Sequence, residues 1–405
     1  MPSADEPRND DADAGLLSPG WAGRPIATAT GDAAVLAAIV LFEVSLATVS
    51  APTGVADRIL EAARGIDPAD LAEGSRANGN PVIPLLAVLR GRLDADDARW
   101  LHRGATSQDA LDTALVLMAR DAAGLIAADA AAAAARLCDH AESHTATVMT
   151  GRTLTQPGTP ITLGLKLAGW AWALATATAA LRRASARLPV QLGGASGTLA
   201  SFVAAEGPGA GMATAERLAA ELGLAVPPAP WHVHRAPLTR LADALVETSD
   251  ALGTIGANVA VLSRREIGEL DDGADGTSSA MPHKSNPVRA VLLNAAARQA
   301  PPLAAQLHLA ASTVDERPDG AWHSEWQTLR LLLRTVGGAA ATARELADGL
   351  RVHPDRIAAN VAASATDLVS ESTAYGPAAA TPGDYLGEAE NLTARLVSAA
   401  RAELA

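Results

Sequence analysis

Aromatic residues and cysteine are both scarce in this chain of 405 residues. Phe, Trp and Tyr together make up 3% of it, whereas hydrophobic residues make up 49% and alanine dominates them. Strands favour aromatic and β-branched residues, and alanine is the strongest helix former. The composition therefore predicts an all-α fold. The single cysteine, Cys138, excludes an internal disulfide and a cysteine-based metal cage, and it suits a reducing cytoplasm.

Positive charge is also in short supply, because 32 Lys and Arg residues stand against 45 Asp and Glu residues. The net charge of −13 argues against non-specific nucleic-acid binding, which needs a basic surface. A small anion can still bind in a locally positive pocket. The first residues are charged and lack an apolar core, so they do not form a secretory signal, and residues 1–15 are expected to be a disordered tail.

Two apolar runs are long enough to be tested as membrane spans, at residues 33–49 and 161–181. Glu43 lies within the first run and Lys166 within the second. A charge in the middle of such a segment costs about 3 kcal/mol on membrane insertion. Both runs are better explained as buried helices of a bundle, and no membrane partner is expected.

Helical runs separated by breaks that contain Pro and Gly fill most of the chain. The pattern predicts helices over residues 32–50, 55–64, 68–74, 82–90, 94–101, 108–144, 161–186, 212–222, 238–270, 288–311 and 323–351. The longest of these exceed the usual globular helix and indicate a long bundle. After the tail we expect an N-terminal helical domain over residues 16–105, a central bundle with the active-site regions over 106–350, and a small C-terminal helical domain over 351–405.

The segment that organises the chain is residues 276–287, G-T-S-S-A-M-P-H-K-S-N-P, called the signature loop below. It reads as a flexible loop that leads into a helix, with Pro287 at the first helical position. Backbone N–H groups at that helix start, with Lys284 beside them, would form an anion site and help a serine to lose its proton. By composition alone, the segment also fits a polar connecting loop.

Two further polar breaks interrupt the long helices. Residues 104–109, G-A-T-S-Q-D, fit a helix cap in which Thr106 or Ser107 is the capping residue and Asp109 lies near the positive helix end. A helix N-terminus of this kind can also bind a carboxylate. Residues 151–160, G-R-T-L-T-Q-P-G-T-P, form the second break.

The signature loop closely resembles the G-S-S-x-M-P-x-K-x-N-P motif of the fumarase/aspartase superfamily, with Thr277 in place of the glycine. The two other breaks resemble that superfamily's first and second regions. Residues 79–84, 188–199 and 316–326 add a resemblance to bacterial 3-carboxy-cis,cis-muconate cycloisomerase, which runs from about residue 16 to residue 333. It implies three helical domains, a homotetramer with a twenty-helix core, active sites shared between subunits, and neither cofactor nor metal.

Carried over position by position, the resemblance implies that Ser278 is the catalytic base. The substrate-binding residues that it implies are Thr106, Ser107, Arg152, Thr153, Gln156, Ser279, Lys284 and Asn286. Leu154 and Pro157 occupy the two positions at which relatives carry the histidine that serves as general acid. Ser285 stands where relatives often have Arg. Because leucine cannot transfer a proton, the leaving group must depart without one or receive it from elsewhere.

The leading expectation is a cytoplasmic, cofactor-independent enzyme of aromatic catabolism that converts 3-carboxy-cis,cis-muconate to 4-carboxymuconolactone. The alternative is a fumarate-forming lyase that expels a stable anion, such as nitrite from nitrosuccinate. Neither leaving group needs protonation, whereas the nitrogen leaving group of adenylosuccinate does, so adenylosuccinate cleavage is disfavoured. Ser278, Lys284 and Asn286 together argue against a non-catalytic scaffold of the same fold.

The sequence offers one candidate metal pair, His232 and His234, within a Pro-rich segment. Neither a carboxylate nor a cysteine stands nearby at ligand spacing. We therefore expect these histidines to lie in a surface loop and no metal to bind.

Overall fold

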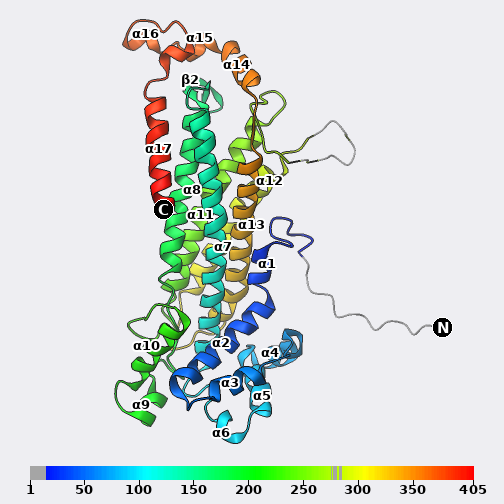
Figure 1. Cartoon of the computed structure of the whole chain (residues 1–405), viewed down its shortest axis with the longest axis vertical. Coiled ribbons are helices and arrows are strands. Elements are labelled where there is room, and N and C mark those ends of the chain that lie inside the picture. The colour runs from blue at the N-terminus through cyan, green and yellow to red at the C-terminus, as the bar shows by residue number, and fades with distance from the viewer. Residues whose placement is uncertain (1–14, 275, 277–280, 282–284) are drawn as a thin grey trace, which may run out of the picture.

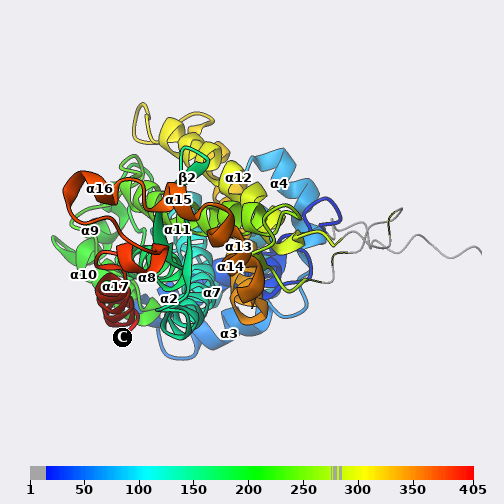
Figure 2. The ribbon, with the colours of Figure 1, turned by 90° about the horizontal axis from the view of Figure 1, so that it is seen from above.

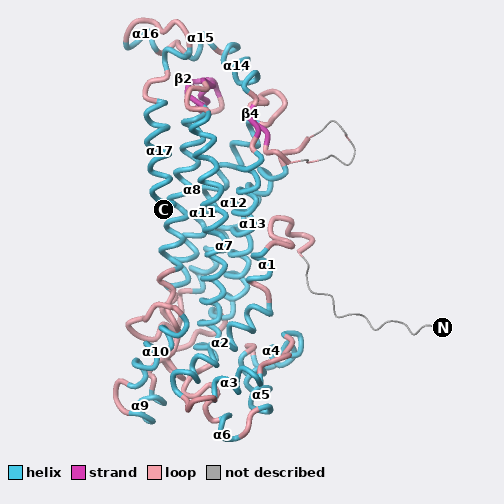
Figure 3. The backbone as a smooth tube through the Cα atoms, viewed as in Figure 1, coloured by secondary structure: helices cyan, strands magenta, loops and turns pink. Residues whose placement is uncertain are grey.

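The computed structural model describes residues 15–274, 276, 281 and 285–405, so all but the last residue of the tail expected at residues 1–15 lies outside the described residues. The described chain is helical along most of its length, and its short strands gather at one end (Figure 3). This confirms the all-α prediction.

Five long helices pack side by side as a bundle (Figures 1 and 2). They are α7 (Ser107–Ser143), α8 (Leu163–Ser185), α11 (Ala236–Leu262), α12 (Val288–Ala310) and α13 (Ala321–Gly349). Small side chains line their contacts: Ala110, Ala122 and Ala130 of α7 are fully buried. Alanine favours the helix and lets neighbouring axes approach closely, so the alanine-rich composition accounts for both the helices and their packing.

Short elements cover the two ends of the bundle (Figure 1). One end carries the end of α2 (Asp32–Ser50) together with α3 (Val55–Ala62), η1 (Pro68–Leu71), α4 (Ala72–Asn78), α5 (Val82–Arg92), α6 (Ala95–Ala98), α9 (Ala200–Glu206) and α10 (Ala210–Leu222), whereas α1 (Pro25–Ala29) packs on the side of the bundle against α7 and α13. The other carries β1 (Val148–Thr153), β2 (Gln156–Thr162), β3 (Leu270–Asp271), β4 (Arg351–Val352), α14 (Pro354–Ala363), α15 (Ala365–Leu368), α16 (Ser372–Tyr375) and η2 (Pro382–Tyr385). The last helix, α17 (Ala389–Leu404), returns along α7 and α8.

The second polar break is a β-hairpin rather than a loop, which the sequence reasoning missed. Strands β1 and β2 pair antiparallel, with Thr153 opposite Gln156. Leu154 and Thr155 form the turn with φ of 48° and 75°. Two left-handed residues give the turn whose twist suits a two-residue hairpin, but such turns usually contain Asn or Gly, so the sequence carries no turn signal here.

Most predicted helices are present, but several boundaries need correction. Residues 68–74 form η1 and then α4, which continues to Asn78, and of residues 94–101 only Ala95–Ala98 are α-helical. Helix α11 ends at Leu262 rather than at residue 270, because Leu270 pairs with Val352 in a short strand instead. Pro287 is the N-cap of α12, and the first helical residue is Val288.

By length and composition, α2 passes as a membrane span among the described residues. Its one charged side chain beyond the first turn, Glu43, is fully buried and lies 2.6 Å from the ring nitrogen Nδ1 of His102. Burial opposes the charged form of His102, but the Glu43 carboxylate prevails and raises the pKa of His102. Since α2 also packs against α7, its apolar surface is explained in part as core.

Candidate active site

Polar groups gather at the N-terminus of α7, at one end of the bundle: Thr106, Ser107 and the N–H groups of the first helical turn, which we call the α7 cup. Thr106 precedes the helix and donates its backbone N–H to the carboxylate of Asp109 at 3.0 Å, which confirms the predicted cap. Thr106 and Ser107 are half-buried. The N–H groups of the first helical turn have no acceptor within the helix and form the positive end of the helix dipole. The α7 cup is therefore suited to binding a carboxylate.

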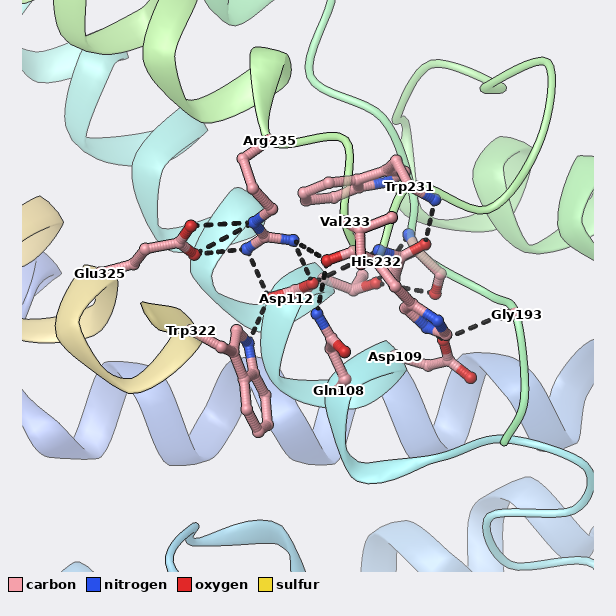
Figure 4. Close-up of polar contacts among 12 residues, drawn as sticks. Gln108, Asp109, Asp112, Gly193, Trp231, His232, Val233, Arg235, Trp322 and Glu325 are labelled. Carbon is pink, nitrogen blue, oxygen red and sulfur yellow. Dashed lines mark hydrogen bonds and ion pairs between the residues drawn. The ribbon is translucent and has the colours of Figure 1, made fainter. Parts of the chain in front are cut away.

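Asp109, in the first turn of α7, binds the glycine-rich loop that contains Gly193 and Gly194 (Figure 4). Its fully buried carboxylate accepts the backbone N–H groups of Gly193 and Gly194 at 2.9 Å each, and lies 2.6 Å from Nε2 of His232. A Cβ on Gly193 would lie 2.7 Å from the His232 ring, so only glycine fits. His232 is therefore buried, and the expectation of a surface-loop histidine was wrong for it.

One turn further along α7, Asp112 anchors a buried arginine (Figure 4). Arg235 donates to both Asp112 oxygens at 2.7 and 3.0 Å, and its Nε donates to Glu325 at 2.9 Å. Trp322 donates its indole N–H to Asp112 at 2.9 Å. Burial disfavours the charge on Arg235, but the two carboxylates hold its pKa above the ordinary value. We call Asp109, Asp112, Arg235 and their partners in Figure 4 the α7 network.

Arg317 reaches the same cup from the loop between α12 and α13, and the sequence reasoning had not singled it out. Its guanidinium donates to Thr106 Oγ1 and to the carbonyl oxygen of Ala195 at 3.0 Å, and to Gln108 Oε1 at 3.2 Å. Arg317 itself is exposed. A forked cation beside a helix N-terminus can bind a carboxylate in a defined orientation.

The hairpin at the opposite end holds the other predicted residues. Arg152 is engaged within the chain, because it donates to both oxygens of the buried Glu269 at 3.0 and 2.7 Å. Thr153 and Gln156 are exposed beside the turn. Lys166 lies nearby in the first turns of α8, where burial and the charge of Arg152 lower its pKa.

Of the signature loop, Ser278, Ser279 and Lys284 lie outside the described residues. Asn286 is half-buried and donates its backbone N–H to the carbonyl oxygen of Gly276 at 2.9 Å, which closes the base of the loop. Asp272 accepts the backbone N–H groups of Arg289 and Ala290 at 2.9 and 3.2 Å. These two donors of α12 are therefore already bonded to a carboxylate of the chain itself, and they are not free to bind a substrate anion.

The chain does not bring its three regions together. Helix α7 has 37 residues, which corresponds to a length of about 55 Å at 1.5 Å per residue. Its N-terminal cup lies at one end of the bundle, and the hairpin lies beyond its other end (Figure 1). The base of the signature loop lies near the hairpin, since Arg152 bonds Glu269 shortly before that loop.

The hairpin turn supplies no group that could protonate a leaving group. Leu154 is 96% exposed at the turn, and Pro157 lies on β2. Within the described part of the chain, no group of His, Cys, Asp and Glu residues has the arrangement of a metal site.

Comparison with known proteins identifies the family. A family model described as a lyase matches residues 27–301. The chain is 45% identical over 394 residues to nitrosuccinate lyase of Streptomyces davaonensis, covering 93% of this chain and 82% of the relative. It is 41% identical over 351 residues to 3-carboxy-cis,cis-muconate cycloisomerase of Pseudomonas aeruginosa, covering 83% of this chain and 75% of the relative.

Among solved structures, the 3-carboxy-cis,cis-muconate lactonizing enzyme of Pseudomonas putida superposes with a TM-score of 0.88. The two sequences are 31% identical, and the match covers 96% of this chain and 100% of the Pseudomonas putida chain. Together with the signature-loop motif, these matches confirm the resemblance seen in the sequence: the chain belongs to the lyase family of the fumarase/aspartase superfamily.

Proposed function

We propose that this enzyme expels a stable anion from a substituted succinate to form fumarate, and that nitrosuccinate, which would release nitrite, is the first substrate to test. The 45% identity to a nitrosuccinate lyase over 394 residues carries this proposal over the cycloisomerase. The hairpin turn, where Leu154 and Pro157 stand in place of the general-acid histidines of relatives, supports it by disfavouring any leaving group that needs a proton. This reverses the order that the motifs alone suggested.

The reaction needs one base and no acid. Ser278, as an alkoxide, takes the proton from the carbon next to one carboxylate, and the electron pair of that C–H bond forms the double bond. The C–N bond breaks as this happens, and nitrite leaves with its electron pair. Because nitrite is stable as an anion, it does not need a proton from the enzyme. Donors on the carboxylate stabilise the negative charge that develops in the transition state.

Each region has a part in this scheme. Thr106, Ser107 and the guanidinium of Arg317 hold one substrate carboxylate at the α7 cup. Ser279, Lys284 and Asn286 hold the carboxylate next to the abstracted proton. Arg152 is a positioning residue that fixes the hairpin through Glu269, so that Thr153 and Gln156 face the substrate.

The site is completed by other copies of the chain. The α7 cup and the hairpin lie at opposite ends of a bundle whose longest helix spans about 55 Å. Antiparallel neighbours related by symmetry would place the hairpin and signature loop of one copy beside the cup of another. We therefore propose a homotetramer with shared active sites, in which residues 16–105 and 351–405 form the domains at the two ends of the central bundle of residues 106–350.

A second candidate is the lactonising cycloisomerase, favoured by the 0.88 TM-score to the Pseudomonas putida enzyme. There a substrate carboxylate adds to the conjugated diene, and Ser278 gives a proton to the carbanion that results. In the reverse direction the carboxylate leaves as an anion, so this reaction also proceeds without the missing histidines.

The test supplies purified enzyme with nitrosuccinate and, separately, with 3-carboxy-cis,cis-muconate. We expect nitrite and fumarate in equal amounts from the first, and loss of both products in the Ser278→Ala variant. Rapid loss of diene absorbance from the second substrate, without nitrite from the first, would replace the lyase by the cycloisomerase. Unchanged turnover in Ser278→Ala would remove Ser278 as the base in either case.

A further inference from the structure

A pocket of about 980 Å³ lies between the C-terminal end of α8, the Pro-rich segment 225–231 and the start of α11. This end of the bundle also carries α10 (Figure 1). None of Thr106, Ser107 and Arg317 lines the pocket, so it is distinct from the α7 cup. Its volume is in the range of pockets that hold organic ligands.

The charged groups that line this pocket all have one sign. Arg183, Arg187 and Arg240 line it together with His234, and the described lining residues include no Asp or Glu. Acidic residues outnumber Lys and Arg by 45 to 32 in the whole chain, so the absence of a carboxylate at this place is not a consequence of composition. Arg183 has one distant carboxylate partner, Glu403 at 3.9 Å, which does not line the pocket.

Helix α11 adds to this positive potential. It has 27 residues, starts at Ala236 and carries no acidic residue in its first turn. Arg240 therefore lies close to the positive end of a long helix dipole, where a cation is unfavourable. Arg183 and Arg187 are placed favourably, because they lie at the C-terminal, negative end of the α8 dipole. The unfavourable placement of Arg240 is offset if an anion occupies the pocket.

The remaining wall is apolar and stiff. Pro227, Pro228 and Pro230 line one side, and Trp231 lies behind them with its ring 4.7 Å from the Arg235 guanidinium carbon. Trp231 is held by two hydrogen bonds, from its indole N–H to Val190 and from its backbone N–H to Gln191, both at 2.9 Å. Because Trp231 is only 2% exposed, it supports the proline wall from behind, and the prolines themselves give a preformed surface for a flat apolar group.

From this geometry we propose that the pocket is a second ligand site, separate from the active site, for an organic anion with two or more negative charges on an apolar frame. Arg187, just past the C-terminal end of α8, and Arg240, near the start of α11, bind the charged groups, and the proline wall contacts the apolar frame. The proposal does not rest on the proposed lyase reaction.

The test uses benzene-1,3,5-tricarboxylate, which has three carboxylates on a flat ring, and measures its binding to the full-length protein by calorimetry. We expect the affinity to fall at least tenfold in the Arg187→Ala, Arg240→Ala double variant. A matched double variant of exposed arginines outside the pocket, Arg76→Ala with Arg395→Ala, should bind as the wild type does. Thermal unfolding of both variants verifies that they fold.

Two outcomes would overturn the proposal. One is that millimolar benzene-1,3,5-tricarboxylate shows no binding to the wild type. The other is equal affinity in the wild type and in the Arg187→Ala, Arg240→Ala variant. In that second case the Arg317→Ala variant shows whether the ligand sits in the α7 cup instead. Loss of binding in Arg317→Ala alone would assign the ligand to the active site and contradict a second site.

Discussion

The two ends of the bundle differ in how far their polar side chains are buried and paired within the chain. At the α7 network, Asp109, Asp112 and Arg235 are almost completely buried, and each bonds partners from distant parts of the chain. At the hairpin, Leu154 is 96% exposed, and Thr153 and Gln156 are exposed beside it. One chain therefore pairs the buried charges of the network end within itself, whereas its hairpin presents side chains to the outside.

This contrast fits the proposal that one chain folds fully and shares its active site with other copies. Burying a charge costs free energy unless the charge is paired and hydrogen-bonded. The charged groups of the α7 network must therefore find their partners within the chain when it folds. An exposed hairpin tip has no such requirement, and its side chains are free to meet another molecule. We infer that the α7 network orients the cup, and that the hairpin and signature loop complete the cup of a neighbouring copy.

The largest expected effect is on the network end. Replacing Asp112 by Ala deprives the buried Arg235 of one of its two carboxylates, and should lower the free energy of unfolding by about 3 kcal/mol. The matched control is Asp129→Ala on the same helix, whose surface pair with Arg344 should contribute at most about 1 kcal/mol. Urea unfolding measures both. Equal midpoints for the two variants would contradict the account of the network.

A smaller, purely functional effect is expected at the cup. Arg317 is exposed, so Arg317→Ala should leave unfolding unchanged but raise KM by about ten- to a hundredfold through loss of a charged hydrogen bond to the substrate. Arg317→Lys keeps the charge but not the fork and should lie between the two. If KM stayed at the wild-type value while kcat fell, Arg317 would not be a substrate-binding residue.

The smallest effect on stability is expected at the hairpin. Leu154 is almost fully exposed, so Leu154→Ser should change the free energy of chain unfolding by less than about 0.5 kcal/mol. It should nevertheless weaken association, because the tip is proposed to contact a neighbour. Analytical ultracentrifugation compares it with Leu60→Ser, an exposed apolar residue on α3. Identical sedimentation of both variants would argue against that contact.

Local signals in the sequence predicted the helices well, because they depend on propensity and on nearby breaks. Helix α2 begins and ends at the predicted residues, and the cap at Thr106 follows from its own neighbours. The hairpin was missed because Leu154 and Thr155 adopt left-handed backbone conformations, which usually occur at Gly or Asn rather than at Leu or Thr.

Contacts between distant residues could not be predicted in the same way. His232 is buried because Asp109, 123 positions away, lies 2.6 Å from its ring, and nothing beside it in sequence shows this. Arg317 meets Thr106 across 211 positions. The family motif partly compensates, since it marked residues 104–109 and 316–326 as related segments, but it did not show which side chains would meet.

The most direct test of a shared site combines two inactive chains. Thr106→Ala with Ser107→Ala removes the cup's hydroxyls, and Ser278→Ala removes the base from the signature loop. If each site takes its cup and its loop from different copies, unfolding and refolding the two variants together should restore about a quarter of the sites, because both parts are intact in one pairing of four. Recovery of activity to that level is the predicted result. Mixed assemblies that form but remain inactive would contradict the shared site.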